Sequence, residues 1–188
     1  MGKEYLLDTN AYFNMLKALN LPEISGQYSE QIELLKQGTI EISSITKVEI
    51  ISVLGKYARG ISGGFQKCNG FISEDGTVCP NNKYVVPRKK WNTRKVKAWM
   101  KLVDDINEGK TDTLTVGVLP FDENTVKIAQ KIIVHALEHS FGSLDAMIAA
   151  TAENEIDKQR DIVVITSDKA LKQCLEKCGI PFWDAFSS

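Results

Sequence analysis

Long apolar runs are absent from this sequence of 188 residues. Its apolar stretches are strand-sized and interrupted by charge, so neither a signal-peptide core nor a membrane span is expected. We therefore expect a cytoplasmic location. The composition is otherwise globular, with 43% hydrophobic and 25% charged residues. This balance excludes disorder over most of the chain and fits one domain with room for an insertion.

Several catalytic signatures are also missing. There is no G-x-S-x-G nucleophile elbow, and no Gly-Lys-Ser/Thr that would end a phosphate-binding loop. His135 and His139 are four residues apart, a spacing at which two imidazoles can share a metal, but no H-E-x-x-H motif accompanies them. A structural role for these histidines is therefore favoured, and neither a serine hydrolase nor a nucleotide-binding switch is expected.

Cysteine is scarce, with four residues and no C-x-x-C motif. Cys68 and Cys79 fall in an expected loop, whereas Cys174 and Cys178 are four apart on an expected helix. Reduced thiols are the favoured interpretation for a cytoplasmic protein. A zinc site that uses Cys68 and Cys79 is the alternative, although nothing in the spacing requires it.

Apolar periodicity predicts strands that alternate with helices. Strands are expected at residues 3–7, 39–42, 113–119, 162–166 and 180–183. Helices are expected to begin near Thr9, Tyr28, Ser43 or Ser44, Asn92 or Thr93, Asp122, Ser143 and Asp168. Alternating strands and helices indicate an α/β fold with a mainly parallel central sheet.

Apolar stripes mark the faces that these helices are expected to bury. The stripe is Val48, Ile51 and Leu54 in the third helix, and Val126, Ala129, Ile133 and Ala136 or Leu137 in the helix that follows Asp122. The alternation stops at about residues 59–112, where five glycines precede a single helix. We therefore expect one domain over residues 1–188 with a loop-plus-helix insertion.

The charge distribution is lopsided. Residues 83–101 contain eight basic residues and no acid, so this segment carries +8 and the remainder −9. A polyanionic partner is favoured over a merely solvated basic face. The candidate RNA-binding residues are Arg88, Lys89, Lys90, Arg94, Lys95 and Lys97. Trp91 is a candidate for stacking on unpaired bases, whereas Trp99 belongs to the apolar stripe of the insertion helix.

Four acidic residues stand where expected strands end or helices begin. They are Asp8, Glu49, Asp145 and Asp168. Each alone has an ordinary explanation, because Asp caps helices and acids favour a helix N-terminus or a solvated helix face. Together they predict a site at the carboxyl edge of the sheet, where open α/β sheets bind ligands. Clustered carboxylates favour Mg²⁺ or Mn²⁺, which prefer oxygen ligands.

The segments around these acids carry a family resemblance. They read Leu6-Leu7-Asp8-Thr9-Asn10, Ser43-Ser44-Ile45-Thr46-Lys47-Val48-Glu49, Ser143-Leu144-Asp145-Ala146-Met147-Ile148-Ala149-Ala150-Thr151-Ala152 and Ile165-Thr166-Ser167-Asp168. In order and spacing they resemble PIN-domain nucleases, especially VapC-type toxins. The resemblance implies a PIN-like three-layer fold and a Mg²⁺- or Mn²⁺-dependent endoribonuclease. It also implies that the four acids are catalytic metal ligands, that Asn10 and Thr166 support them, and that the protein forms a homodimer and binds an antitoxin.

Other functions remain open at this stage. The insertion at 59–112 is longer than compact toxins carry, so a nuclease for RNA maturation or defence fits the same acids. A non-catalytic RNA- or protein-binding module on a PIN-like fold is the main alternative. Receiver and phosphatase domains also place carboxylates at strand ends, but a phosphatase of the haloacid-dehalogenase type needs D-x-D where Asp8-Thr9-Asn10 stands.

Overall fold

The computed structural model describes residues 2–21, 26–60, 65–67, 83–85, 90–111, 114–138 and 141–186, with backbone alone at 65–67 and 83–85. The chain divides into two compact units, Met1–Ile50 with Val103–Ser188, and Ile51–Leu102. Cys68, Cys79, Arg88, Lys89 and His139 lie outside the described residues, so the predictions about them stay predictions.

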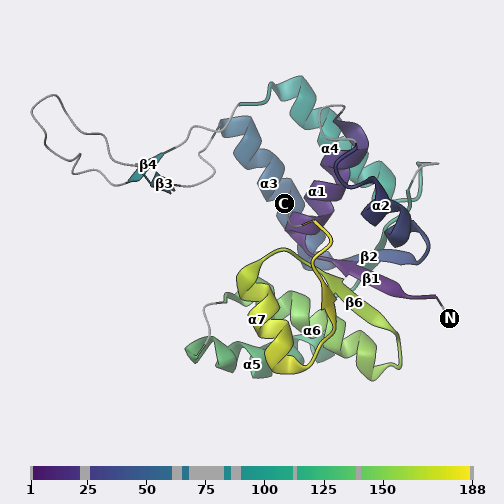
Figure 1. Cartoon of the computed structure of the whole chain (residues 1–188), viewed down its shortest axis with the longest axis vertical. Coiled ribbons are helices and arrows are strands. Elements are labelled where there is room, and N and C mark those ends of the chain that lie inside the picture. Colours follow the sequence, from purple (N-terminus) through teal and green to yellow (C-terminus); the bar gives the residue numbers. More distant parts are fainter. Residues whose placement is uncertain are drawn as a thin grey trace, which may run out of the picture. The chain divides into compact units, whose positions relative to one another are not determined.

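A parallel sheet of five strands forms the centre of the first unit (Figure 1). The strands are β1 (Glu4–Leu7), β2 (Thr39–Ser43), β5 (Gly117–Leu119), β6 (Ile162–Ile165) and β7 (Phe182–Trp183). Their order is β5-β2-β1-β6-β7, and every neighbouring pair is parallel. The predicted α/β fold with a mainly parallel sheet is therefore confirmed.

Strand register brings the segments after the strands to one edge. Leu7 lies opposite both Ile42 of β2 and Ile165 of β6, and Ile165 lies opposite Trp183 of β7. Because these strands run in the same direction, the residues that follow them leave the sheet side by side. This carboxyl edge is therefore where the predicted acidic residues can meet.

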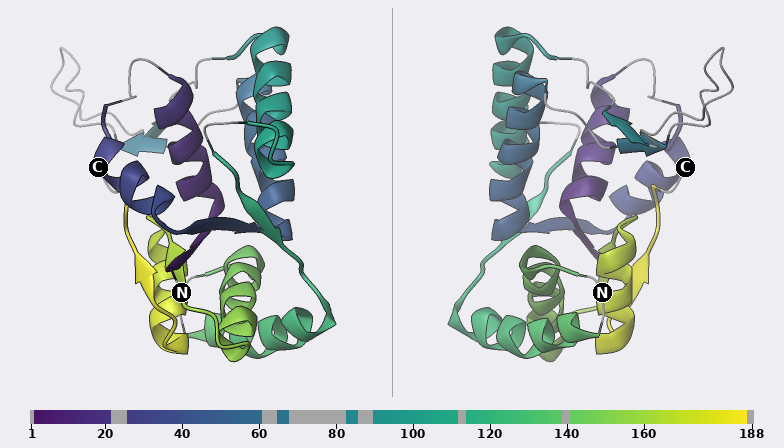
Figure 2. Two further views of the ribbon diagram at one scale, coloured as in Figure 1. Left: turned by 90° about the vertical axis from the view of Figure 1, so that its right-hand side faces the viewer. Right: turned by 90° about the vertical axis from the view of Figure 1, so that its left-hand side faces the viewer.

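Helices cover both faces of the sheet, which confirms the three-layer prediction. In Figures 1 and 2, α5, α6 and α7 lie on one face and α1 and α2 on the other. The helices of this unit are α1 (Thr9–Asn20), α2 (Ser29–Lys36), the start of α3 (Ser44–Arg59), α5 (Glu123–Ile132), a 3-10 turn η1 (Ile133–Leu137), α6 (Ser143–Asp157) and α7 (Lys169–Cys178). No helix within the described ranges is long and apolar enough to cross a membrane.

The core under α5, α6 and α7 depends on small side chains. Ala149, Ala150 and Ala152 of α6 are fully buried against Leu6 of β1 and Val164 of β6. Alanines let a helix axis approach a sheet closely, and each buried aliphatic side chain contributes about 1.5–3 kcal/mol by leaving water. Close packing of α6 on the sheet holds the first turn of that helix near the carboxyl edge.

The second unit contains a short hairpin and parts of two helices, the end of α3 and most of α4. Strands β3 (Phe65–Lys67) and β4 (Lys83–Val85) pair antiparallel, and α4 (Thr93–Asn107) begins after Asn92, whose side chain accepts from the Lys95 N–H at 2.7 Å. The expected stripe of α4 is buried at Val96, Trp99, Val103 and Ile106, with Met100 half-buried. The insertion predicted at 59–112 overlaps this unit, and the single-domain interpretation stays a prediction.

Two predicted stripes are wrong in part, since Leu54 and Ala129 are buried as expected but other members are exposed. In α3, Ile50 and Leu54 are buried, whereas Val48 is 72% exposed and Ile51 37% exposed. Apolar residues occur on several sides of α3, so periodicity alone does not choose the buried face.

In α5 the buried residues are Thr125, Ile128, Ala129 and Ile132, whereas Val126 is 38% exposed and Leu137 is 88% exposed. The buried face of α5 differs from the predicted one because hydrogen bonds to Asp122 and Asn154 hold Thr125 on the buried side. The chain also tightens to a 3-10 turn after Ile132, and that turn changes the period from 3.6 to 3.0 residues.

Arg160 gathers three carboxylates near the amino ends of β1 and β6. Its guanidinium contacts Glu4 at 2.6 Å, Glu41 at 2.7 Å and Glu155 at 2.5 Å. Glu41 and Glu155 are buried acids, and burial of an acid is tolerated when the charge is paired and hydrogen-bonded. This cluster explains why charged residues occur inside the otherwise apolar β1 and β2.

Gly38, just before β2, approaches β1 too closely for a side chain. A Cβ at this position would meet the Lys3 carbonyl oxygen at 2.3 Å and the Tyr5 ring at 2.8 Å. We expect Gly38→Ala to lower the free energy of unfolding in urea by about 1–3 kcal/mol, as overpacking does. Gly26→Ala is the matched control, since nothing lies within 4 Å of the place its methyl group would take, and equal stability of the two variants would contradict the close approach.

Candidate functional site

The carboxyl edge of the sheet contains a cavity of about 350 Å³. All four predicted acids line it, together with Asn10. The full lining is Asp8, Thr9, Asn10, Glu49, Gly142, Ser143, Leu144, Asp145, Ile148, Asp168 and Leu171. The structure thus brings together acidic side chains from the starts of α1, α3, α6 and α7 that are up to 160 positions apart in the sequence.

Asp8 is the most buried of the acids, with 3% of its surface exposed. It follows β1 and caps α1, because its Oδ1 accepts from the Ala11 N–H at 2.6 Å. Its Oδ2 accepts from the Thr166 hydroxyl at 2.5 Å, and Thr166 itself is buried directly after β6. Thr166 is therefore a buried hydrogen-bond partner of Asp8 that does not line the cavity, and its role as a polar support of the site stays a prediction.

Asp168 and Asp145 also combine a cap with a place in the cavity. Asp168 Oδ1 accepts from the N–H groups of Ala170 at 2.7 Å and Leu171 at 3.1 Å, at the start of α7. Asp145 Oδ2 accepts from the Gly142 N–H at 2.8 Å. The N-cap of α6 is Gly142 and not Ser143 as predicted. The carboxylate of Asp145, in the first turn of α6, provides the acceptor that the Gly142 N–H needs. The capping explanation is thus confirmed for these acids, and their role as metal ligands stays a prediction.

Glu49 comes from the second turn of α3 and lies half-buried. Its Oε2 accepts from the Thr9 hydroxyl at 2.5 Å. Thr9 is buried next to Asp8, so this bond links α3 to the start of α1 across the cavity floor. Sequence reasoning did not single out Thr9, although a hydroxyl beside a strand-end carboxylate is a usable signal.

The pKa values of Asp8 and Asp145 are raised in this cavity. Burial raises the pKa of Asp8 to about 6, the Ala11 N–H and Thr166 hydroxyl oppose this, and the charges of Asp168 and Glu49 add to it. Burial also raises the pKa of Asp145, with further contributions from the charges of Asp168 and Glu49. The cavity therefore concentrates negative charge in a partly desolvated place, where a cation would be stabilising.

The donor set of the cavity fits a hard divalent cation. It offers carboxylate oxygens and no imidazole or thiolate, the ligands that Mg²⁺ and Mn²⁺ prefer. Within the described ranges, no three His, Cys, Asp or Glu side chains come close enough together to form a complete ligand set. Helix caps and hydroxyls already occupy one oxygen or more of each acid. A cation held by one or two carboxylates with waters, as is usual for Mg²⁺, fits this arrangement.

The basic candidates lie in the second unit. Lys90, Arg94 and Lys97 are exposed and Lys95 is half-buried. The Lys95 Nζ lies 4.4 Å from the centre of the Trp91 ring, which also packs on Tyr57 at 4.6 Å and on Trp99 at 4.9 Å. The Trp91 N–H donates to the Tyr57 carbonyl oxygen at 3.1 Å, so this cluster joins the end of α3 to the residues before α4. Base stacking by Trp91 stays a prediction.

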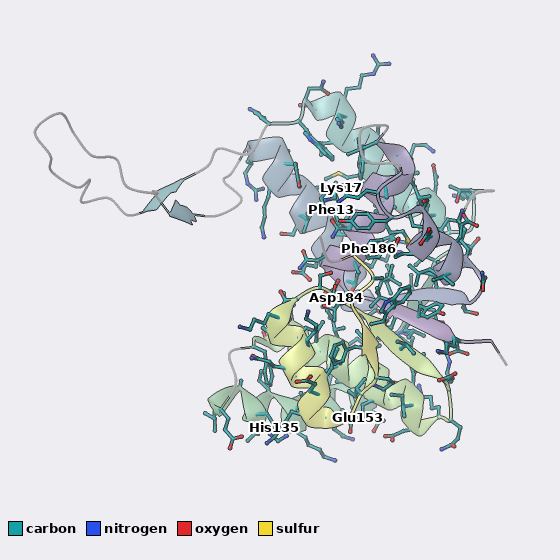
Figure 3. All side chains as sticks on the ribbon, viewed as in Figure 1. Phe13, Lys17, His135, Glu153, Asp184 and Phe186 are labelled. Carbon is teal, nitrogen blue, oxygen red and sulfur yellow. The ribbon has the colours of Figure 1, made fainter. Side chains whose placement is uncertain are left out.

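Other residues from the sequence analysis lie away from the cavity. His135 is in η1, and Figure 3 shows it with Glu153 at the far end of the α5–α7 layer from Asp184. Cys174 and Cys178 are free thiols on α7, the first buried and the second half-buried. None of these three residues lines the acidic cavity.

Sequence reasoning missed one polar group at the carboxyl edge. Asp184 follows β7 and accepts from Ser167 Oγ at 2.6 Å and from Lys172 Nζ at 2.7 Å. The signal was available, because Asp184 stands after the last strand as Asp8 stands after the first. The very short β7 made that signal weak.

The fold and site define an α/β protein with an acidic cavity at the carboxyl edge of a parallel sheet. Residues 5–174 match the PIN domain family, so the chain belongs to the PIN-domain family. Proteins of this family are generally nucleases. A comparison with curated proteins gives no match.

Solved structures share the fold at low identity. The chain resembles FitAcB from Neisseria gonorrhoeae, with 14% identity, a TM-score of 0.53, and coverage of 98% of this chain and 99% of that one. It resembles VapBC-1 from nontypeable Haemophilus influenzae, with 19% identity, a TM-score of 0.54 and coverage of 98% and 99%. It also resembles VapBC2 from Rickettsia felis, which was solved bound to a DNA fragment from the promoter. The identity is 19%, the TM-score is 0.54, and the coverage is 96% of this chain and 99% of that one. These likenesses show the fold.

The raised pKa of Asp8 predicts a pH dependence of stability in metal-free protein. The folded chain binds this proton more tightly than the unfolded chain, so the contribution stabilises below about pH 4 and is lost as the pH rises through 6. Asp8→Asn removes this loss. Between pH 4 and pH 7 in EDTA, we expect the free energy of unfolding of the variant to rise relative to wild type by about 2 kcal/mol.

Urea unfolding at each pH measures this difference. Asp161→Asn, at an exposed position before β6, is the control for the change in net charge and should follow wild type. A difference between Asp8→Asn and wild type that does not change with pH would show that Asp8 titrates as an ordinary carboxyl.

Proposed function

We propose that this PIN-domain protein is a Mg²⁺- or Mn²⁺-dependent endoribonuclease, with Asp8, Glu49, Asp145 and Asp168 as its catalytic metal ligands. One observation carries the proposal. Four carboxylates from four helix beginnings line a single cavity, where burial, together with the charges of Asp168 and Glu49, raises the pKa values of Asp8 and Asp145. Such crowding is unfavourable for folding alone, and strained electrostatics of this kind occur preferentially at functional sites.

Each part of the cavity has a chemical task under this proposal. A divalent cation, when bound, polarises a phosphodiester and increases the acidity of a nearby water. Asp8 is held rigidly by the Ala11 N–H and the Thr166 hydroxyl, so it offers charge at a fixed place. Asp145 and Asp168 both line the cavity, and in each the cap bonds use only one of the two carboxylate oxygens. The Thr9 hydroxyl orients Glu49, and Asn10 can donate to a phosphate oxygen.

RNA is the proposed substrate because three of the basic candidates, Lys90, Arg94 and Lys97, are exposed on the second unit. Lys90, Arg94 and Lys97 would neutralise backbone phosphates without reading sequence. We also propose the homodimer and the antitoxin partner that the VapC-type resemblance implies. Growth arrest in cells that express the chain would distinguish a toxin from a nuclease of RNA maturation.

The catalytic proposal predicts loss of cleavage in near-isosteric variants. We expect Asp8→Asn, Glu49→Gln, Asp145→Asn and Asp168→Asn each to lower cleavage of a mixed RNA pool in Mg²⁺ by more than about 100-fold, because each removes ligand charge. The amides preserve hydrogen-bond acceptors for the caps, so the circular dichroism spectrum should be unchanged. Mapping the cut ends, with and without EDTA, measures both activity and specificity.

Asp122→Asn is the matched control for these variants. Asp122 caps α5 by the same bond, from the Thr125 N–H at 2.8 Å, but does not line the cavity. It should cleave as wild type does. Wild-type protein that binds RNA but never cuts it in Mg²⁺ or Mn²⁺ would instead support the non-catalytic binding module.

The basic surface predicts a salt effect. We expect the triple variant Lys90→Gln, Arg94→Gln and Lys97→Gln to weaken binding of single-stranded RNA and to flatten the dependence of log K on log salt by ~0.7 per lost phosphate contact. Fluorescence anisotropy at several salt concentrations measures this slope. The control removes equal charge from exposed lysines of the first unit, Lys127, Lys131 and Lys177. Equal slopes for the two triple variants would exclude a role for α4 in RNA capture.

A further inference from the structure

We propose that Asp184 is a positioning residue for Asp168, because its carboxylate ties down the turn before Asp168 and holds the Lys172 ammonium away from the acidic cavity. Asp184 itself is outside the cavity lining. The metal-related part of this inference rests on the proposed function, whereas the positioning of the turn does not. Asp184 is labelled in Figure 3.

The pairing of β6 with β7 places Asp184 beside the Asp168 turn. Ile165 lies opposite Trp183, and the Thr166 N–H donates to the Trp183 carbonyl oxygen at 3.2 Å. The chains therefore leave the sheet together, with Ser167 next to Asp184. Ser167 Oγ donates to Asp184 Oδ1 at 2.6 Å, which fixes the residue that immediately precedes Asp168.

The second oxygen of Asp184 binds a cation on α7. Lys172 Nζ donates to Asp184 Oδ2 at 2.7 Å, and both side chains are less than one third exposed. Lys172 stands four residues after Asp168, a spacing at which helix side chains meet. Without Asp184, the acids at helical spacing from Lys172 are Asp168, four residues before it, and Glu176, four residues after it, and the order with the acid before the lysine is the more favourable one. A Lys172–Asp168 pair would compete with a metal for the Asp168 carboxylate.

Asp184 thus contacts residues on both sides of Asp168 in the sequence, Ser167 before it and Lys172 after it. On the inner side, the Asp168 N–H donates to Thr166 Oγ1 at 3.0 Å, and the same Thr166 hydroxyl donates to Asp8. Asp184 adds an outer attachment through Ser167 and Lys172. The orientation of Asp168 is therefore determined by four residues that do not line the cavity, which are Thr166, Ser167, Lys172 and Asp184.

Mn²⁺ binding to metal-free protein, measured by electron paramagnetic resonance, tests the role of Lys172. We expect Asp184→Asn, which preserves an acceptor for Ser167 but releases Lys172, to weaken Mn²⁺ binding by about tenfold. Adding Lys172→Met to that variant should restore most of the affinity. Asp161→Asn is the charge-matched control and should bind as wild type does. Unchanged affinity in Asp184→Asn, or no recovery in the double variant, would overturn the proposed shielding of Asp168.

Amide hydrogen exchange in EDTA tests the positioning of the turn without any metal. Asp184→Ala removes both contacts, so the Ala170 and Leu171 amides, which donate to Asp168, should exchange about tenfold faster, while the Thr125 amide at the α5 cap should not change. Unchanged exchange at Ala170 and Leu171 would overturn the positioning role. Wild-type protein that neither binds Mn²⁺ nor cleaves RNA would overturn the proposed function, and hydrogen exchange would still decide whether Asp184 holds the turn.

Discussion

The burial of one carboxylate, Asp8, is the constraint on which the site depends. A buried acid must be hydrogen-bonded, and Asp8 obtains its partners from the start of α1 and from Thr166 after β6. These bonds join two neighbouring strands at the edge where both end. The same bonds hold the carboxylate in place and oppose the rise in its pKa, which burial causes and the charges of Asp168 and Glu49 increase. Stability of the edge and strain in the cavity therefore have the same origin.

Helix capping and the acidic cavity are one arrangement in this protein. Asp8, Asp145 and Asp168 each satisfy N–H groups at the beginning of a helix, and all three of those helices begin at the carboxyl edge. A parallel sheet with crossover helices brings helix N-termini to one edge, so caps made by acids gather there. Helix dipoles lessen the repulsion among the carboxylates, while the charges of Asp168 and Glu49 still add to the burial that raises the pKa values of Asp8 and Asp145.

The two edges of the sheet handle negative charge in opposite ways. Near the amino ends of β1 and β6, Arg160 pairs with Glu4, Glu41 and Glu155, so the acids there are neutralised within the fold. At the carboxyl edge, the cation Lys172 is bound by Asp184, which is outside the cavity, so it does not neutralise the cavity acids. The protein thus completes its charge pairing at one edge and leaves it incomplete at the other, where a ligand would complete it.

The order and type of the elements could be read from the sequence, because short β-rich apolar runs such as 162–166 and caps such as Asp122 and Asp168 are local signals. The four acids could be named for the same reason, since each stands at an element boundary. The buried faces of α3 and α5 could not be read from the sequence, because each helix has apolar residues on more than one side. Val48 competes with Ile50, and Val126 with Ile128, and only packing in the folded protein selects the buried residue. Strand order, which places Thr166 under Asp8 and Asp184 beside Ser167, was likewise decided by tertiary structure. Those contacts join residues 158 and 17 positions apart, and no local pattern records which strands become neighbours.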